Sequence, residues 1–266
     1  MVFKYGWLPD LPDARDVLFK AGKVPLPDKV FIEGLPPVFN QYQLGSCTAN
    51  AVANAHLYCQ MKQPGGESIT PSRLFIYYNA RKVRGWEKVD SGSSIRDAVK
   101  QVNKLGTCSE EEWPYIVEKF NKKPEKGCYI KGKEYQVLSY YRVAQTLKSL
   151  KECLALGFPV VLGISLFESF ESEYAYKTGD IGMPDPQEQF LGGHAVLCVG
   201  YDDEKQRFHM MNSWGVDWGN KGFFTLPYNY LLNKGLAADF WTIRFVEEGN
   251  EENGDTYFNF SDIALS

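Results

Sequence analysis

The feature that most constrains the fold is an alanine-rich run, CTANAVANAHLYCQM, at residues 47–61. Cys47, Ala51, Ala55 and Cys59 recur every four residues, so these small side chains share one face of a helix. A helix with such a face can be approached closely by its neighbours. The sequence therefore predicts a closely packed, buried helix that begins near Cys47.

Two further helices are predicted in the first half of the chain. Thr70-Pro71 is typical of a helix start and predicts a helix over about 71–82. Ser94 is placed to cap another helix, whose apolar residues share one face and which ends at Gly106. The first half is therefore expected to be mainly helical.

Strands dominate the second half. After a predicted helix over about 144–156, the run FPVVLGISL predicts a buried strand. HAVLCVGYD, a polar DDEKQ turn and RFHMMNSW predict a hairpin, and GFFTLP and DFWTIRFV predict more strands. The sequence thus predicts an α+β fold, with a mainly helical lobe over 26–138, a β-rich lobe over 139–246 and an acidic C-terminal tail over 247–266.

Charge and cysteine usage exclude several classes of protein. The 29 basic and 33 acidic residues give a formal net charge of −4, too weak a field to attract nucleic acid or a membrane surface. No run approaches the roughly 20 apolar residues of a membrane span, and the N-terminus carries Pro and Asp where a signal peptide is apolar. The 6 cysteines form neither a disulfide framework nor a zinc motif. We expect a monomer without cofactor or metal, in the cytoplasm or in a particle assembled there.

Cys47 stands apart from the other cysteines. A free thiol has a pKa near ~8.5 and supplies little thiolate at neutral pH, whereas a helix N-terminus favours the negative charge. Cys47 follows Gly45-Ser46, which gives a tight approach, and it opens the alanine-rich helix. The other cysteines lie in a helix body, a helix end, a strand or connecting segments. Cys47 is therefore the candidate nucleophile.

A thiolate needs an imidazole partner, and the chain has 3 histidines. His56 lies further along the same helix as Cys47, too far away to touch its sulfur. His209 alternates out of phase with Asn212 on a regular strand, so these two should face opposite sides. His194 follows two glycines at the start of an apolar strand, where a polar side chain is otherwise unexpected. His194 is therefore the candidate base.

Three segments resemble the papain family of cysteine peptidases, in the family's chain order. NQYQLGSCTANA resembles the nucleophile segment, in which a glutamine precedes the cysteine by six residues, as Gln41 precedes Cys47. GGHAVLCVGYD resembles the histidine segment, and MNSWGVDWGNKGFFTL resembles the Asn-Ser-Trp-Gly segment. The three span positions 41–224, and the chain is most similar to short-leader bacterial and viral branches.

This resemblance implies a papain-like two-lobed fold, with a helical left lobe, a β-barrel-like right lobe and the active cleft between them. It implies that Cys47 attacks the scissile carbonyl, that His194 pairs with it and later protonates the leaving amine, and that Asn212 orients the imidazole. Gln41 and the Cys47 backbone N–H would stabilise the oxyanion. The implied activity is hydrolysis of protein or peptide substrates through an acyl-enzyme intermediate.

The resemblance also implies a set of substrate-binding residues. They are Gly92, Ser93, Gly193, Trp214, Ala238 and Asp239. SGSS (91–94) is similar to the wall of the S2 subsite, which binds the residue second before the scissile bond (P2), and LAADFW (236–241) is similar to its floor. Small Ala238 would favour a bulky apolar P2 side chain, whereas an inward-pointing Asp239 would also admit a basic one.

The chain departs from the family pattern beside the nucleophile. The aromatic residue that usually follows the cysteine is Thr48 here, and the cysteine that usually lies three residues before it is Leu44. The family's disulfide from that position therefore cannot form. This loss is typical of a reducing compartment.

Residues 1–25, called the leader below, replace the long helical prosegment of the family. One interpretation is a loosely packed extension without function. The other is a short inhibitory prosegment across the cleft, favoured by Trp7 as an aromatic anchor, by two prolines that stiffen the path, and by the charges of Arg15-Asp16. Fully extended, the leader spans roughly 80 Å, enough to cross a domain of this size.

Two other functions stay open. One is a different thiol hydrolase, such as an amidase, a peptide transferase or a deubiquitinase-like enzyme. The other is a catalytically silent particle component. A silent protein gains nothing from an activated thiol, so the intact set of four catalytic residues favours a cysteine peptidase made as a zymogen.

Overall fold

The computed structural model describes residues 4–63 and 68–246, so the predicted tail over 247–266 lies outside the described residues. The elements, with η for 3-10 helices, follow in this order: β1 (Lys29–Phe31), α1 (Cys47–Lys62), α2 (Arg73–Lys82), α3 (Ile95–Leu105), η1 (Val117–Lys119), α4 (Lys126–Gly132), η2 (Lys133–Tyr135), β2 (Val137–Arg142), α5 (Leu147–Ala155), β3 (Val160–Phe167), η3 (Glu168–Glu171), α6 (Glu173–Thr178), β4 (Phe190–Asp202), β5 (Arg207–Met211), β6 (Phe223–Pro227), α7 (Tyr228–Leu232) and β7 (Ala237–Val246). Within the described ranges, none of the helices combines the length and the apolarity that a bilayer crossing requires.

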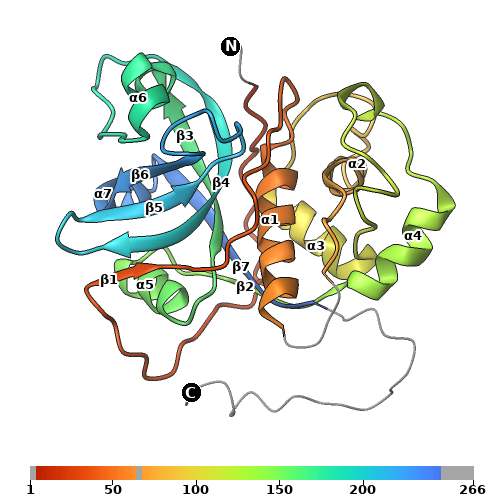
Figure 1. The fold of residues 1–266 in the computed structure, drawn as a ribbon, viewed down its shortest axis with the longest axis horizontal. Helices are drawn as coiled ribbons and strands as arrows, with labels where there is room; N and C mark the ends of the chain where they lie inside the picture. Colours follow the sequence, from red (N-terminus) through yellow and green to blue (C-terminus); the bar gives the residue numbers. More distant parts are fainter. Residues whose placement is uncertain (1–3, 64–67, 247–266) are drawn as a thin grey trace.

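Helix α1 lies at the centre of the molecule. It packs against β4 and β7 on one side and against α2 and α3 on the other (Figure 1). Its residues from Cys47 to Gln60 are all buried, because both flanks are covered. The alanine positions allow this close approach, and the predicted buried helix beginning at Cys47 is confirmed.

Side-chain caps set where the other helices start. α3 begins after Ser94, whose Oγ accepts a hydrogen bond from a backbone N–H at 3.1 Å, and it ends at Gly106 with φ +64°, as predicted. α2 begins later than predicted, because its cap is Ser72, which accepts from a backbone N–H at 3.2 Å, and not Thr70. α5 likewise begins after its cap Thr146 and is shorter than predicted.

The strands form one antiparallel sheet in the order β2-β7-β3-β4-β5-β6, with β1 added to β4 (Figure 1). The predicted hairpin is formed by β4 and β5, with Asp202 opposite Arg207 at its turn. The predicted barrel-like form is wrong: the sheet is not closed, because β2 and β6 are its two separate ends. The placing of a lobe boundary near residue 138 stays a prediction.

Both faces of the sheet are buried, each in its own apolar cluster. Along β4, Ala195, Leu197 and Val199 face the cluster that includes α1, α2 and α3. The alternate residues Val196 and Cys198 face a second cluster, to which α5 contributes. This double burial explains why β4 reads as a continuous apolar run and not as an alternating one.

Candidate active site

Cys47 is the first residue of α1, and its side chain is fully buried. No side chain of the described residues caps this helix start, so its N-terminal N–H groups stay available to a negative charge. The backbone N–H groups of Gly6 and Ala195 also approach the sulfur. Because Ala195 directly follows His194 on β4, the packing of α1 against β4 brings the two predicted catalytic residues to one place.

The imidazole of His194 is held on one edge and stacked on one face. Its Nε2 lies 2.8 Å from Asn212 Oδ1, which also accepts from Ser213 N–H at 2.8 Å. An acceptor at this position places the ring proton on Nε2 and leaves Nδ1 as a bare acceptor. Nδ1 is buried, without a hydrogen-bond partner in the described part of the chain. Trp214 stacks on the ring, with centroids 4.9 Å apart and planes at 28°.

Gln41 is fully buried, and each end of its amide is fixed. Its Oε1 accepts from Ser213 Oγ at 2.7 Å, and its Nε2 donates to Leu44 O at 2.9 Å. The same Nε2 donates at 3.0 Å to the carbonyl oxygen of Lys4, which belongs to the leader. One N–H of Gln41 is therefore aimed at a carbonyl from outside its own turn.

The leader crosses this site in an extended form, running beside α1 between the sheet and the helices (Figure 1). Ser93 binds its backbone twice, donating from N–H to Gly6 O at 2.8 Å and accepting from Leu8 N–H at 3.1 Å. Gly92 has φ +73°, and a Cβ there would lie 2.2 Å from Gly6 O. A glycine at position 92 is therefore required for this close approach.

The Trp7 indole fills the neighbouring pocket. Trp7 N–H donates to Gly193 O at 3.0 Å, and its ring lies so close to Gly163 that a Cβ there would meet it at 1.9 Å. Trp7 Nε1 donates to Asp239 Oδ2 at 3.1 Å, so this carboxylate points toward the indole. Ala238 pairs with Gly163 across β7 and β3 and therefore lies on the same face of the sheet.

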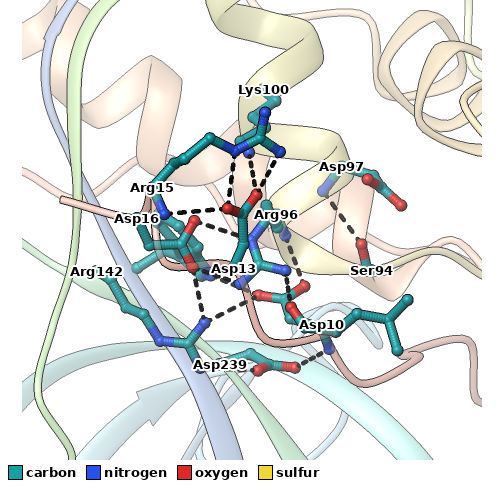
Figure 2. Close-up of polar contacts among 12 residues, drawn as sticks. Asp10, Asp13, Arg15, Asp16, Ser94, Arg96, Asp97, Lys100, Arg142 and Asp239 are labelled. Atoms are coloured by element: carbon teal, nitrogen blue, oxygen red, sulfur yellow. Dashed lines mark hydrogen bonds and ion pairs between the residues drawn. The ribbon is translucent and has the colours of Figure 1, made fainter.

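A cluster of charges anchors the leader beyond Trp7 (Figure 2). Asp16 forms ion pairs with Arg96 of α3 and, at 3.2 Å, with Arg142 at the end of β2. Asp10 accepts from Arg96 N–H at 3.0 Å and from Trp241 Nε1 at 2.8 Å. Both carboxylates are thus paired with residues of the enzyme body.

Burial beneath the leader decides the protonation of the catalytic pair. Burial raises the pKa of the Cys47 thiol, although the backbone N–H groups around the sulfur oppose this. Burial also lowers the pKa of His194 to about 4, although its hydrogen bond with Asn212 opposes this. Desolvation penalises both charges, so at pH 7 this leader-covered form holds a neutral thiol and a neutral imidazole.

The geometry agrees with a family comparison. The sequence pattern of the papain family cysteine proteases matches residues 32–239 of the chain. This chain belongs to the papain family. It is 37% identical over 279 residues to the uncharacterized peptidase C1-like protein L477 of Acanthamoeba polyphaga mimivirus, a match that covers 94% of this chain and 90% of that protein. Cathepsin K of Gallus gallus is 30% identical over 211 residues, which cover 76% of this chain and 58% of that protein.

Solved structures agree with this assignment. Xylellain, a cysteine protease from Xylella fastidiosa, is similar with a TM-score of 0.86 and 41% identity, covering 91% of this chain and 96% of that one. Digestive procathepsin L 3 of Tenebrio molitor has a TM-score of 0.67 at 21% identity, covering 85% and 72%, and so supports the fold. The chain is a cysteine peptidase that acts on protein or peptide substrates.

Sequence reasoning missed several residues of this papain-family site. Ser213, which positions Gln41, was only part of a motif, and Gly163 was one residue of a strand. Arg142, which contacts the leader, carried no local signal at all. Each depends on contacts between distant elements, which the order of the strands decides.

His56 lies outside the site, with Nε2 at 2.8 Å from Tyr135 O.

Proposed function

We propose that Cys47, His194 and Asn212 perform the peptide-bond hydrolysis of this cysteine peptidase. The observation that carries this proposal is the His194 ring, which is hydrogen-bonded at Nε2 and has no partner at Nδ1 among the described residues. The ring lies on β4, where the backbone N–H of the next residue, Ala195, approaches the Cys47 sulfur. In an open site, Nδ1 takes the thiol proton and the sulfur attacks the scissile carbonyl carbon. The imidazolium then protonates the leaving amine, and water cleaves the resulting thioester.

Gln41 and the Cys47 backbone N–H stabilise the oxyanion in this mechanism. The support is the 3.0 Å hydrogen bond from Gln41 Nε2 to the carbonyl oxygen of Lys4, which stands in for a substrate carbonyl. Ser213 fixes the amide orientation, so the donor is oriented before substrate arrives. Such a donor contributes about 3–4 kcal/mol to transition-state binding in comparable sites.

The leader acts as an inhibitory prosegment, so the described form is a zymogen. Three groups that a substrate needs are occupied: the sulfur by Gly6 N–H, the Gln41 amide by Lys4 O, and the neighbouring pocket by Trp7. The leader contributes a backbone N–H, that of Gly6, to the surroundings of the sulfur. The leader therefore covers the nucleophile and the oxyanion donor at the same time.

The enzyme acts as a monomer in a reducing compartment, the cytoplasm or a particle assembled there. All six cysteines lie in the described ranges and are free and buried, which suits a place where disulfides do not form. The weak net charge of −4 favours neither a nucleic-acid nor a membrane partner.

Replacing the nucleophile tests the catalytic proposal. Cys47→Ala should lower hydrolysis of a fluorogenic peptide by at least about 10³-fold and abolish labelling by a thiol-directed epoxide. Cys59→Ala is the matched control, because Cys59 is another buried cysteine of α1. It should keep both signals. Hydrolysis by Cys47→Ala at the parental rate, with the fold intact, would show that another group is the nucleophile.

A further inference from the structure

Asp239 binds the leader through an oxygen that loses its partners when the leader moves away. The residue is 4% exposed. Its Oδ2 accepts from Trp7 Nε1 at 3.1 Å and from Asp10 N–H at 2.7 Å, and both donors belong to the leader. Its Oδ1 faces Arg142 Nη2 at 3.3 Å, a contact within the enzyme body (Figure 2). Opening therefore exposes one unpaired carboxylate oxygen, and the other stays paired.

The pocket around this oxygen is narrow and fits a flat aromatic ring. Two glycines form its sides: a Cβ on Gly163 would lie 1.9 Å from the Trp7 ring, and a Cβ on Gly193 would lie 2.8 Å from it. Asp239 has φ +59°, a backbone conformation that is uncommon outside glycine. This strained backbone directs the carboxylate toward the indole edge. The pocket thus combines apolar room for an indole with one hydrogen-bond acceptor at its end.

The charges around Asp239 favour a neutral substrate side chain in the pocket. Arg142 lies between Asp239 and Asp16, 3.3 Å and 3.2 Å from their carboxylates. The charge of Asp239 is therefore already compensated within the enzyme. A cationic side chain in the pocket would meet the Arg142 guanidinium, whereas a neutral N–H donor meets only the unpaired oxygen.

We propose that Asp239 makes the opened enzyme select substrates with tryptophan at P2, whose indole N–H donates to Asp239 Oδ2 in the place of Trp7. The inference rests on the proposed function and deepens it. A purely apolar pocket would treat Trp and Phe alike, because both rings fill it. An acidic pocket without Arg142 would instead favour Arg.

Peptides that differ only at P2 test this selection. The enzyme is the full chain with Trp7→Ala and Asp16→Asn, which empty the pocket and remove the buried ion pairs that hold the leader. The peptides carry Trp, Phe, Leu or Arg at P2. We expect kcat/KM for Trp to exceed that for Phe about tenfold or more, because a buried carboxylate oxygen would otherwise be unpaired. Arg should rank below Phe. A Trp-to-Phe ratio within twofold of one, or Arg ahead of Trp, overturns the proposal.

Variants at position 239 assign the effect to this carboxylate. Asp239→Gly tolerates the positive φ and removes the acceptor, so the Trp-to-Phe ratio should fall to about one. Asp239→Asn keeps an acceptor oxygen, so it should lower the ratio without abolishing it, and this variant decides if the glycine variant does not fold. A ratio that stays at the parental value in a folded variant overturns the proposal.

A second readout needs no substrate. Trp7→Phe in the full chain keeps the ring and removes only the N–H, so epoxide labelling of Cys47 should accelerate about tenfold over the parent. Labelling at the parental rate overturns the proposal. If the chain with Trp7→Ala and Asp16→Asn neither cleaves any peptide nor labels at Cys47, the proposed function fails and this inference with it. Cleavage with a flat P2 profile overturns the inference alone.

Discussion

Asn212 holds the imidazole of His194, the proposed catalytic base, through one 2.8 Å contact between its Oδ1 and His194 Nε2. Asn212→Ala should lower kcat/KM roughly ten- to a hundredfold, less than Cys47→Ala, because Nδ1 can still take the thiol proton in a fraction of ring orientations. Steady-state hydrolysis of a fluorogenic peptide measures this. Asn229→Ala, at an exposed position of α7, is the matched control and should leave the rate unchanged. A loss as large as that of Cys47→Ala would mean that Asn212 does more than orient the ring.

The sequence predicted some residues of the site and left others open for a physical reason. Cys47 and His194 carry local signals, a helix start and a polar side chain beginning an apolar strand. The choice between Ala238 and Asp239 stayed open, because the orientation of the carboxylate depends on the left-handed backbone at Asp239. No local pattern encodes a positive φ at a residue other than glycine.

At the scale of elements, the ion pairs of Asp16 hold the leader against α3 and β2. Asp16→Asn should raise the peptidase rate of the full chain at least about tenfold, because it leaves the Arg96 guanidinium without its buried partner. The side chains of Asp16 and Arg96 are 5% and 8% exposed. Hydrolysis of a small peptide at fixed ionic strength measures the change.

Asp13→Asn is the control, since it makes the same substitution three residues away. Asp13 pairs with Arg15 within the leader and, at 3.3 Å, with Lys100 of α3 (Figure 2). The side chains of Arg15 and Lys100 are 84% and 35% exposed, and such exposed pairs contribute little. Its rate should stay within about twofold of the parent. Equal rates for the two variants would show that the buried pair does not hold the leader.

Two titrations act on leader docking with opposite signs. Covered His194 has a pKa of about 4, below its ordinary 6.5, so the open form binds the additional proton and docking weakens as pH falls from 6.5 to 4. Burial, with nearby Asp239, raises the pKa of docked Asp10 to about 6 from its ordinary 3.8. Docking therefore strengthens as pH falls from 6 to 3.8. The two effects should nearly cancel.

Asp10→Asn should reveal the histidine effect. Without the Asp10 titration, opening of the leader should increase by up to about tenfold per pH unit as pH falls from 6.5 to 4. Hydrogen exchange at the Trp7 and Leu8 amides, corrected for intrinsic rates, reports this opening. The parent should show a nearly flat profile. A flat profile in the variant would contradict the assignment to His194.

Elements differed in how well the sequence predicted them. α1 was predicted because its small residues repeat every four positions, and β4 because its apolar run is long. β1 has only 3 residues, and it is ordered by its pairing with β4. Caps also shifted helix starts, because Ser72 satisfies the free N–H groups that Thr70 was expected to bind. Such features depend on competition between neighbours, which a residue pattern alone does not resolve.

For the whole molecule, the enzyme and its leader form one folded unit around the cleft. The leader contacts α1, α3 and the sheet. In the proposed zymogen it competes with substrate at a high effective concentration, because it is part of the same chain. A leader that crosses the cleft was one of two interpretations of the sequence, favoured by Trp7 and the charges at Arg15-Asp16. The sequence did not predict that Arg96 and Arg142 would anchor it.

The most direct measurement compares the full chain with a chain that begins at Leu26, each with and without Cys47→Ala. Hydrolysis of one small fluorogenic peptide is followed after circular dichroism has shown that all four proteins are folded. The chain from Leu26 should be faster than the full chain, and Cys47→Ala should abolish hydrolysis in both. Equal rates for the two folded parents, or hydrolysis that survives Cys47→Ala, would contradict a Cys47 peptidase held closed by its own leader.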